Sequence, residues 1–451
     1  MNKKNPIALC LAATLLAAAP AYAETPDEAL ARRLDALTQE LEALKTQVKQ
    51  LKAQNEALAA QQEGSTAGAG AGVAPGTTTT VALDPYTAPT GVSTQASANT
   101  VLGRTSLFGY GEINYNHYDH DSSRTEATVR RAVFGIGYRY DENTRFVSEF
   151  EVENAVVSAE DGGEFEVEQF YVDHRFTDWA NLKAGLLLIP SGYINTTHEP
   201  PRYFGVERNF VETAIIPSTE REGGIALYGS TRYGLSYDIG VTTSFNFANW
   251  DFGSNEGRES PLGAAHQELS NARAADLAQY VALNYDGIRG LNIGASVFTG
   301  EAGQNQPNFT ASPHFTLTEA HARYVRGPLQ LQALYAQGHI SDTAAVNLAN
   351  VGQPTPIPSN FHGWYLQSAY RVWKHRDLEF VPFFRYERFN TADNYAALPA
   401  GLGLPGQGTE TVRTYGASFF LNPNVVFKAD YQQFGIDKAS NRFNLGVGLQ
   451  F

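Results

Sequence analysis

The segment Arg442–Phe451 reads RFNLGVGLQF and ends the chain on an aromatic residue. Successive side chains of an extended strand point to opposite faces, so alternate residues share one face. One face carries the apolar residues Phe443, Leu445, Val447, Leu449 and Phe451, and the other carries Asn444, Gly446, Gly448 and Gln450. An apolar face opposite a small or polar one, ending on Phe, is typical of the last strand of a transmembrane β-barrel. The segment therefore predicts a membrane barrel and not a soluble enzyme.

The first 23 residues predict a signal peptide. Lys3 and Lys4 form a positive start, residues 7–19 form an apolar run, and residues 21–23 read Ala-Tyr-Ala, a suitable cleavage site. The apolar run is too short for a retained membrane helix. The single cysteine, Cys10, lies within it. The mature chain is therefore expected to have no disulfide and no thiolate metal site.

Composition narrows the remaining classes. No later stretch offers eighteen uncharged apolar residues, so no membrane helix is expected. Only helices and closed barrels satisfy their backbone groups in lipid, which leaves a secreted soluble protein or a barrel. Aromatic residues make up 12% of the chain, as a barrel with aromatic girdles requires. The net charge of −14 disfavours nucleic acid as a partner.

Residues 24–63 predict a coiled coil. Apolar residues recur at alternating spacings of four and three, and Asn55 occupies one of the inner positions; the repeat comprises Leu30, Leu34, Leu37, Leu41, Leu44, Val48, Leu51, Asn55 and Leu58. Such a repeat predicts oligomerisation, and it leaves open whether two or three helices associate. A single amphipathic helix is the alternative. Residues 64–103 are rich in Gly, Ala, Thr, Ser and Pro and predict a flexible linker.

From residue 104 to residue 451 the hydrophobic period is two. We expect sixteen strands, an even number, as in a sixteen-stranded antiparallel transmembrane β-barrel. They are placed at residues 105–118, 126–140, 145–155, 165–176, 181–189, 223–231, 235–247, 276–286, 291–299, 314–325, 329–339, 361–373, 378–389, 411–421, 425–436 and 442–451. Short connections alternate with longer polar ones, which predicts short periplasmic turns, long external loops and a periplasmic N-terminal segment. A soluble β-sandwich, the alternative, would not need this alternation.

The third external loop, Pro190–Glu222, is the longest connection in this assignment and carries four prolines. Loops of this length are usually functional or disordered. Its apolar residues are too many for a solvated excursion, and we expect the loop to fold into the lumen and narrow it. The alternative is an external loop packed on its neighbours.

The chain resembles the phosphate-selective porin O/P family. The resemblance is carried by Leu186–Gly229, LLLIPSGYINTTHEPPRYFGVERNFVETAIIPSTEREGGIALYG, by Arg130-Arg131, by the N-terminal coiled coil and by the terminal Phe. It implies a sixteen-stranded trimeric porin in which the third loop forms the constriction. It also implies phosphate selectivity through a ladder of Arg and Lys. This sequence matches that ladder less well than it matches the rest of the family pattern. The third loop carries three arginines and five glutamates, namely Arg202, Arg208, Arg221, Glu199, Glu207, Glu212, Glu220 and Glu222.

The strand pattern assigns side chains to the lumen if apolar residues face lipid. The charged and titratable lumen residues expected are Arg131, Arg139, Glu149, Glu151, Glu153, Lys183, Glu319, His321, Arg323, Arg371, Arg385, Glu387, Lys428, Asp430 and Arg442. Three glutamates in a row, at 149, 151 and 153, would repel anions unless cations oppose them. Arg131 and Arg139 on the neighbouring strand are the candidates. Opposed acidic and basic walls would give weak net selectivity. For each charge taken alone, a solvated lumen surface is the simpler interpretation.

Other motifs carry little weight. His117, Asp119, His120 and Asp121 could hold a divalent cation at a loop tip, but a solvated loop is the simpler interpretation. Residues 401–406 match GxGxxG without a following helix, so a dinucleotide site fails on context. No catalytic site, metal or cofactor is predicted, and a membrane-embedded hydrolase would need a nucleophile beside a His base.

We therefore expect a Gram-negative outer-membrane porin, not an enzyme, through which small hydrophilic solutes or inorganic ions, phosphate among them, diffuse passively. Its expected partners are outer-membrane lipid and two further copies of itself. The alternative is a tether that joins the outer membrane to the cell wall through the coiled coil. The sequence names neither the permeating solute nor the sign of the preferred ion.

Overall fold

The computed structural model describes residues 101–155, 163–309, 311–398 and 406–451. The expected signal peptide, the coiled coil and most of the linker lie outside these residues. The described part begins with a short helix, α2 (Val101–Arg104), at the end of the expected linker. No helix in the described ranges has the length and apolar character to cross a membrane.

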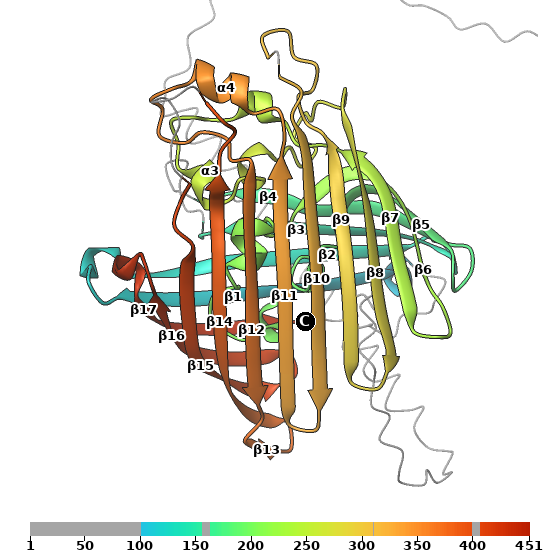
Figure 1. Cartoon of the computed structure of the whole chain (residues 1–451). Coiled ribbons are helices and arrows are strands. Elements are labelled where there is room, and N and C mark those ends of the chain that lie inside the picture. The colour runs from blue at the N-terminus through green and yellow to red at the C-terminus, as the bar shows by residue number, and fades with distance from the viewer. Residues whose placement is uncertain (1–100, 156–162, 310, 399–405) are drawn as a thin grey trace, which may run out of the picture. The chain divides into compact units, whose positions relative to one another are not determined.

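The remainder is one antiparallel sheet closed on itself (Figure 1). Its strands are β1 (Thr105–Tyr118), β2 (Glu126–Arg139), β3 (Thr144–Glu153), β4 (Phe165–Arg175), β5 (Asn181–Leu188), β6 (Arg221–Ser230), β7 (Leu235–Thr243), β8 (Leu277–Ile288), β9 (Leu291–Glu301), β10 (His314–Arg326), β11 (Leu329–Ile340), β12 (Asn360–Tyr370), β13 (Trp373–His375), β14 (Leu378–Asn394), β15 (Glu410–Asn422), β16 (Val425–Phe434) and β17 (Arg442–Gln450). Because β12 and β13 both pair with β14, they form one interrupted strand, and the barrel has sixteen strands as predicted.

The closing contact joins the two ends of the barrel sequence. Strand β17 pairs with β1, from Tyr110 opposite Gln450 to Tyr118 opposite Arg442. The backbone of Phe451 continues the pairing, since its N–H donates to the Gly109 carbonyl at 2.9 Å and its carbonyl accepts from Gly109 at 3.1 Å. None of the described strands is left as an open edge, as a barrel in lipid requires.

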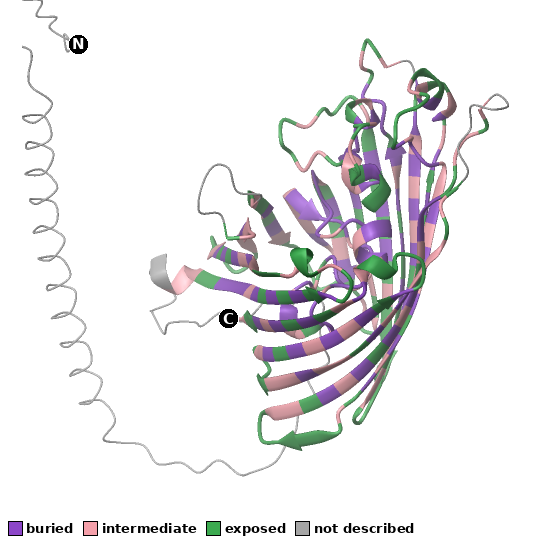
Figure 2. Cartoon of the chain, turned by 90° about the vertical axis from the view of Figure 1, so that its left-hand side faces the viewer, coloured by how far each residue is buried: buried purple, intermediate pink, exposed green. Residues whose placement is uncertain are grey.

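Side chains alternate between the two faces of the wall (Figure 2). On β17, Phe443 and Leu445 are exposed on the outside while Asn444 is fully buried inside, as the opening pattern predicted. Exposed apolar residues on the other strands, such as Phe134, Ile225 and Leu366, lie on the same outer face. Together they form the apolar band that faces lipid.

Long loops gather at one end of the barrel, and the strand pairs meet in short turns at the other (Figure 1). The long loops carry the short helices η1 (Ser122–Arg124), η2 (Pro200–Arg202), η3 (Val211–Ile215), η4 (Phe247–Asn249), α3 (Glu256–Glu259), η5 (Gly263–Ala265), α4 (Ala344–Ala349) and η6 (Lys438–Ser440). We call residues 189–220, between β5 and β6, the third loop. Residues 244–276, between β7 and β8, are the fourth loop.

The fourth loop, and not the third, is the longer of the two, and the prediction that the third is the longest connection is wrong. Strand β7 stops at Thr243 rather than continuing to residue 247. Beyond it four consecutive residues, Ser244, Phe245, Asn246 and Phe247, are at most 1% exposed, so the alternation of faces ends there. Asn246 also accepts a hydrogen bond from the Ala248 N–H and begins η4, which turns the chain away from the sheet.

Candidate functional site

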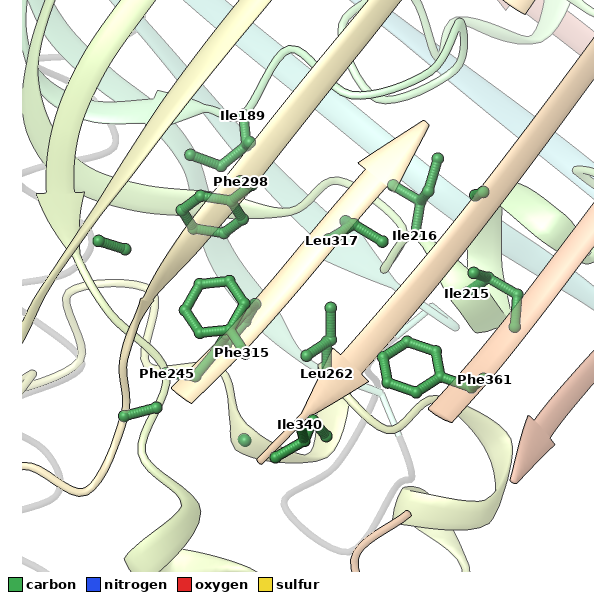
Figure 3. Close-up of a cluster of buried hydrophobic side chains, with 14 of the residues drawn as sticks. Ile189, Ile215, Ile216, Phe245, Leu262, Phe298, Phe315, Leu317, Ile340 and Phe361 are labelled. Carbon is green, nitrogen blue, oxygen red and sulfur yellow. The ribbon is translucent and has the colours of Figure 1, made fainter. Parts of the chain in front are cut away.

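The third loop lies inside the barrel and packs on its inner wall. Its apolar residues Val211, Ile215 and Ile216 are at most 1% exposed. They join a cluster with Leu317 of β10 and Phe361 of β12, which Figure 3 draws as sticks. Burying several large apolar side chains this way fixes one side of the loop, because each contributes about 1.5–3 kcal/mol relative to exposure. The expectation that the loop's apolar content folds inward agrees with this geometry.

The fourth loop contributes to the same apolar cluster. Phe245 and Leu262 pack against the inner faces of the strands, and the Phe245 ring meets Phe298 and Phe315 edge to face at 5.6 and 4.6 Å between centroids (Figure 3). Phe298 and Phe315 therefore face inward. The assumption that apolar strand residues face lipid is wrong for these positions of β9 and β10. There the inner face of the wall contacts the third and fourth loops instead of water.

Glu212 organises the third loop internally. One carboxylate oxygen accepts hydrogen bonds from the backbone N–H groups of Tyr193, at 2.5 Å, and Ile194, at 2.8 Å. The other accepts from the Asn209 side chain, at 2.7 Å, and from the Tyr365 hydroxyl of β12, at 2.9 Å. A buried carboxylate with this many donors is well satisfied and holds two turns of the loop together against the wall.

Carboxylates of β14, β16 and β1 accept hydrogen bonds from the third loop. The Val206 N–H donates to Asp430 of β16 at 2.6 Å, and the Phe210 N–H donates to Glu387 of β14 at 2.7 Å. The Tyr203 hydroxyl donates to Glu112 of β1 at 2.7 Å. All three carboxylates are at least 95% buried. The loop thus contacts strands on both sides of the barrel and spans its interior.

The glutamate row of β3 lies beneath the third loop and not on an open lumen surface. Glu149 and Glu151 are 7% and 2% exposed. Arg131 binds Glu112 at 2.7 Å and approaches Glu151 at 3.5 Å and Glu153 at 3.9 Å, as expected for an opposing cation. Its guanidinium is therefore occupied by this network.

Two of the remaining predicted residues, Arg139 and Lys183, lie near the short-turn end of the barrel. Arg139 lies at the short-turn end, where a pocket of about 430 Å³ is lined by Arg139, Arg145, Arg175 and Asp173 among others. It is therefore placed away from the glutamate row that it was expected to oppose. Lys183 forms an ion pair with Asp238 at 2.5 Å near the same end.

The loop arginines separate in the structure. Arg221 is 3% exposed and binds Glu166 at 2.5 Å and Glu268 at 2.8 Å. Arg208 is 5% exposed and donates to the Ser218 hydroxyl. Arg208 is thus occupied inside the third loop, whereas Arg221, the first residue of β6, is occupied by β4 and the fourth loop. Arg202 is exposed instead.

Arg202, Arg323 and Arg385 line one narrow cavity of about 20 Å³ between the third loop and the wall from β10 to β14. Its other lining groups are aromatic, hydroxyl, amide and aliphatic, and no carboxylate of the described residues lines it. Arg385 is paired with Glu387 at 2.7 Å. Among the described residues, Arg202 and Arg323 have no carboxylate oxygen within 4.0 Å. A volume of this size holds about one water.

Sequence reasoning missed several inward groups on β1 and β4. Glu112, Asn114 and Asn116 are at most 5% exposed and follow the period of two, so the pattern that located other lumen residues could have found them. Glu168 is harder to find, because it breaks the alternation of β4.

The loop-tip residues His117 to Asp121 do not converge. Asp121 caps η1 by accepting from the Ser123 N–H at 3.1 Å, and Asp119 accepts from the Tyr431 hydroxyl at 2.5 Å. In the described ranges, one group of side chains does bring metal-ligating atoms together, namely Glu149, Glu168 and His198. Burial, reinforced by the Arg208 guanidinium, lowers the pKa of His198 to about 4.

Comparison with known proteins places this barrel in a family. The family model for phosphate-selective porin O and P matches residues 106–442. An uncharacterised protein of Aquifex aeolicus (strain VF5) is 32% identical over 341 residues, which cover 72% of this chain and 74% of the relative. Among solved structures, OmpF of Salmonella typhi in complex with daunomycin has a TM-score of 0.53 at 13% identity, covering 77% of this chain and 97% of the other. The DcaP channel of Acinetobacter baumannii has a TM-score of 0.48 at 12% identity, covering 77% and 97%. The chain belongs to the phosphate-selective porin O and P family of outer-membrane channel proteins.

Proposed function

We propose that small hydrophilic solutes diffuse passively through this barrel and that the third loop narrows their path. The support is the set of contacts that fix the loop across the interior, from the apolar cluster on β10 and β12, through Glu387 on β14 and Asp430 on β16, to Glu112 on β1. The path then runs through the narrow cavity between the third loop and the wall, beside Arg323 and Arg202.

The charge of this passage favours small anions over cations. Arg202 and Arg323 bring positive charge without a bound carboxylate, and the nearby glutamates are occupied by Arg131, Arg385 or loop N–H groups. Rings of Arg or Lys give pores a preference for anions. We expect the preference to be moderate, because two cations in a wet passage are screened. Inorganic phosphate is one candidate solute. A homotrimer, as proposed from the resemblance, would place three such passages side by side.

A planar bilayer tests the proposal. Full-length protein should give ohmic steps, and the reversal potential across a KCl gradient should have the sign of chloride preference. Arg323→Gln combined with Arg202→Gln should move that potential toward the cation side. Arg232→Gln, which changes an exposed arginine in a short turn, is the matched control and should leave it unchanged. Well-folded protein without conductance would overturn the porin function, and cation preference in the wild type would overturn the role of the arginines.

A further inference from the structure

Three side chains with metal-ligating atoms meet beneath the third loop. They are Glu149 of β3, Glu168 of β4 and His198 of the loop, and their ligand atoms all lie within 4.8 Å of one another. The side chains are buried, with 7%, 0% and 4% of their surfaces exposed. His198 Nε2 stands 3.9 Å from Glu168 Oε1. None of the contacts that fix the loop elsewhere uses this trio.

An irregularity in β4 creates the arrangement. Glu149 is opposite Gln169, but the next residue, Phe150, is opposite Val167, so Glu168 is an extra residue in β4. A β-bulge of this kind redirects a side chain out of the regular alternation. Here it turns Glu168 into the barrel beside Glu149. Within the described part of the chain, no Lys or Arg nitrogen lies within 4.0 Å of either carboxylate.

Hydrogen bonds orient each of the three groups. His198 Nδ1 lies 3.1 Å from the carbonyl oxygen of Asn195, and because a carbonyl only accepts, Nδ1 carries the hydrogen. The Nε2 atom therefore faces Glu168. The Tyr110 hydroxyl donates to Glu168 Oε2 at 3.1 Å, and the Gln169 amide donates to Glu149. Metal-binding histidines commonly donate their second ring N–H to a carbonyl in this way, and metal-binding carboxylates are themselves hydrogen-bonded.

The surroundings hold further carboxylates. Two adjacent carboxylates out of water repel each other unless a cation or a proton lies between them. Beside them, Glu199 has a buried oxygen without a hydrogen-bond partner, and Glu151 shares Arg131, 3.5 Å away, with Glu112. The nearest guanidinium groups have other partners, since Arg131 binds Glu112 and Arg208 donates to Ser218.

We propose that Glu149, Glu168 and His198 bind one divalent transition-metal ion, best matched by zinc, which joins the third loop to β3 and β4. One imidazole and two carboxylates are a donor set that Zn²⁺ accepts, with bonds of about 2.0–2.2 Å and a fourth position for water. Two atoms bonded to one such ion lie about 3–4 Å apart. The observed spacing of at most 4.8 Å thus needs only a small closure.

Zinc binding to the purified full-length protein tests the site. After treatment with EDTA, the protein is incubated with Zn²⁺ alone and desalted, and bound zinc is measured by mass spectrometry. The expected result is one ion per protomer in the wild type and loss of that ion in His198→Gln and in Glu168→Gln. His120→Gln changes an exposed loop histidine and serves as the matched control. Substoichiometric wild-type binding, or full binding in both site variants, overturns the proposal.

X-ray absorption at the zinc edge of the loaded wild type decides the ligands even if a variant does not fold. One imidazole with oxygen ligands supports the site, and a shell of oxygen alone overturns it. A proton shared between the two carboxylates, the competing explanation, gives no bound zinc.

The effect of the ion on the third loop rests on the proposed channel function, whereas the binding test does not. EDTA should increase current noise in the open wild-type channel and Zn²⁺ should restore the quiet state, with neither effect in His198→Gln. Stoichiometric zinc without any change in current would keep the site and overturn its role in holding the loop.

Discussion

Pro200 in the third loop packs directly against Gly448 of the last strand, so that a Cβ atom on Gly448 would stand 2.4 Å from Pro200 Cβ. Such a distance is a clash. Gly446 is similarly close to Val206, with 3.0 Å to its Cγ1 atom. The small inner face of β17 is therefore not only a lumen surface, because it makes room for the loop that crosses the barrel.

Gly448→Ala should displace Pro200 and change the single-channel conductance. Overpacking in a filled interior costs about 1–3 kcal/mol, and the loop can relieve it by moving. Gly111→Ala in β1 is the control, since its added methyl would lie no closer than 3.3 Å to a neighbour. An unchanged conductance in Gly448→Ala, in channels of normal thermal stability, would show that the loop position does not set the current.

Tyr203→Phe should destabilise the barrel by about 1–3 kcal/mol, because a buried Glu112 oxygen loses its donor. The comparison is Tyr431→Phe, whose hydroxyl also donates to a carboxylate, Asp119, but at an exposed position. That change should cost much less. The temperature at which the folded band is lost in gel electrophoresis measures both, and equal shifts would contradict the argument from burial.

Arg385→Ala should be among the most destabilising single substitutions in the wall. It removes the partner of Glu387, which is 0% exposed and then holds only the Phe210 N–H. Breaking a buried ion pair on one side typically costs about 3–5 kcal/mol. Arg175→Ala removes an exposed pair with Asp178 and should cost little. A double variant, Arg385→Met with Glu387→Leu, should recover much of the loss.

Most of the barrel is predictable from the sequence because one rule, the period of two, fixes both the strands and their faces. The observed boundaries differ from the expected ones by a few residues, with the larger errors at β7 and β14. Strand β7 ends at the fourth loop, and the end of β14 contacts the same loop, since the Thr391 hydroxyl donates to the Arg258 carbonyl. Tertiary packing decides where such strands stop.

The groups inside the barrel were harder to predict than the strands, because the third and fourth loops bring together residues that are far apart in the sequence. Phe298 and Phe315 face inward only because the fourth loop covers them. Glu149, Glu168 and His198 come from three separate segments, and one of them depends on a bulge, so no sequence spacing identifies the trio. The coiled coil remains a prediction, since it lies outside the described residues.

The free energy of unfolding should fall as the pH rises, because of Glu220 at the end of the third loop. Both of its carboxylate oxygens are buried without a hydrogen-bond partner, and burial together with Glu222 and Glu268 raises the pKa of Glu220 well above its usual value. The folded protein therefore binds this proton more tightly than the unfolded chain. Its stabilising effect is complete below the unfolded pKa, about 4.3, and is lost as the pH rises through the folded pKa.

Glu220→Gln keeps the shape of the side chain but removes its charge. The variant's stability should therefore depend less on pH, and its gain in stability over the wild type should be largest at high pH. Glu256→Gln, at an exposed position of α3, should leave the dependence as it is. Thermal denaturation over a pH series measures the effect, and parallel curves for Glu220→Gln and the wild type would contradict it.

Deletion of residues 24–100, with the signal peptide kept, separates the channel from the tether. If the barrel alone is the porin, the shortened protein should conduct as the full chain does, because the residues described here already supply the passage and the contacts that fix the third loop. If the heptad segment also holds the trimer together, the shortened protein should dissociate at a lower temperature in mild detergent. A deletion of residues 64–100 alone keeps the heptads and serves as the control.

Normal conductance together with an envelope that sheds vesicles would favour the tether as a second role, whereas loss of conductance in folded, trimeric barrels would contradict the assignment of transport to the barrel.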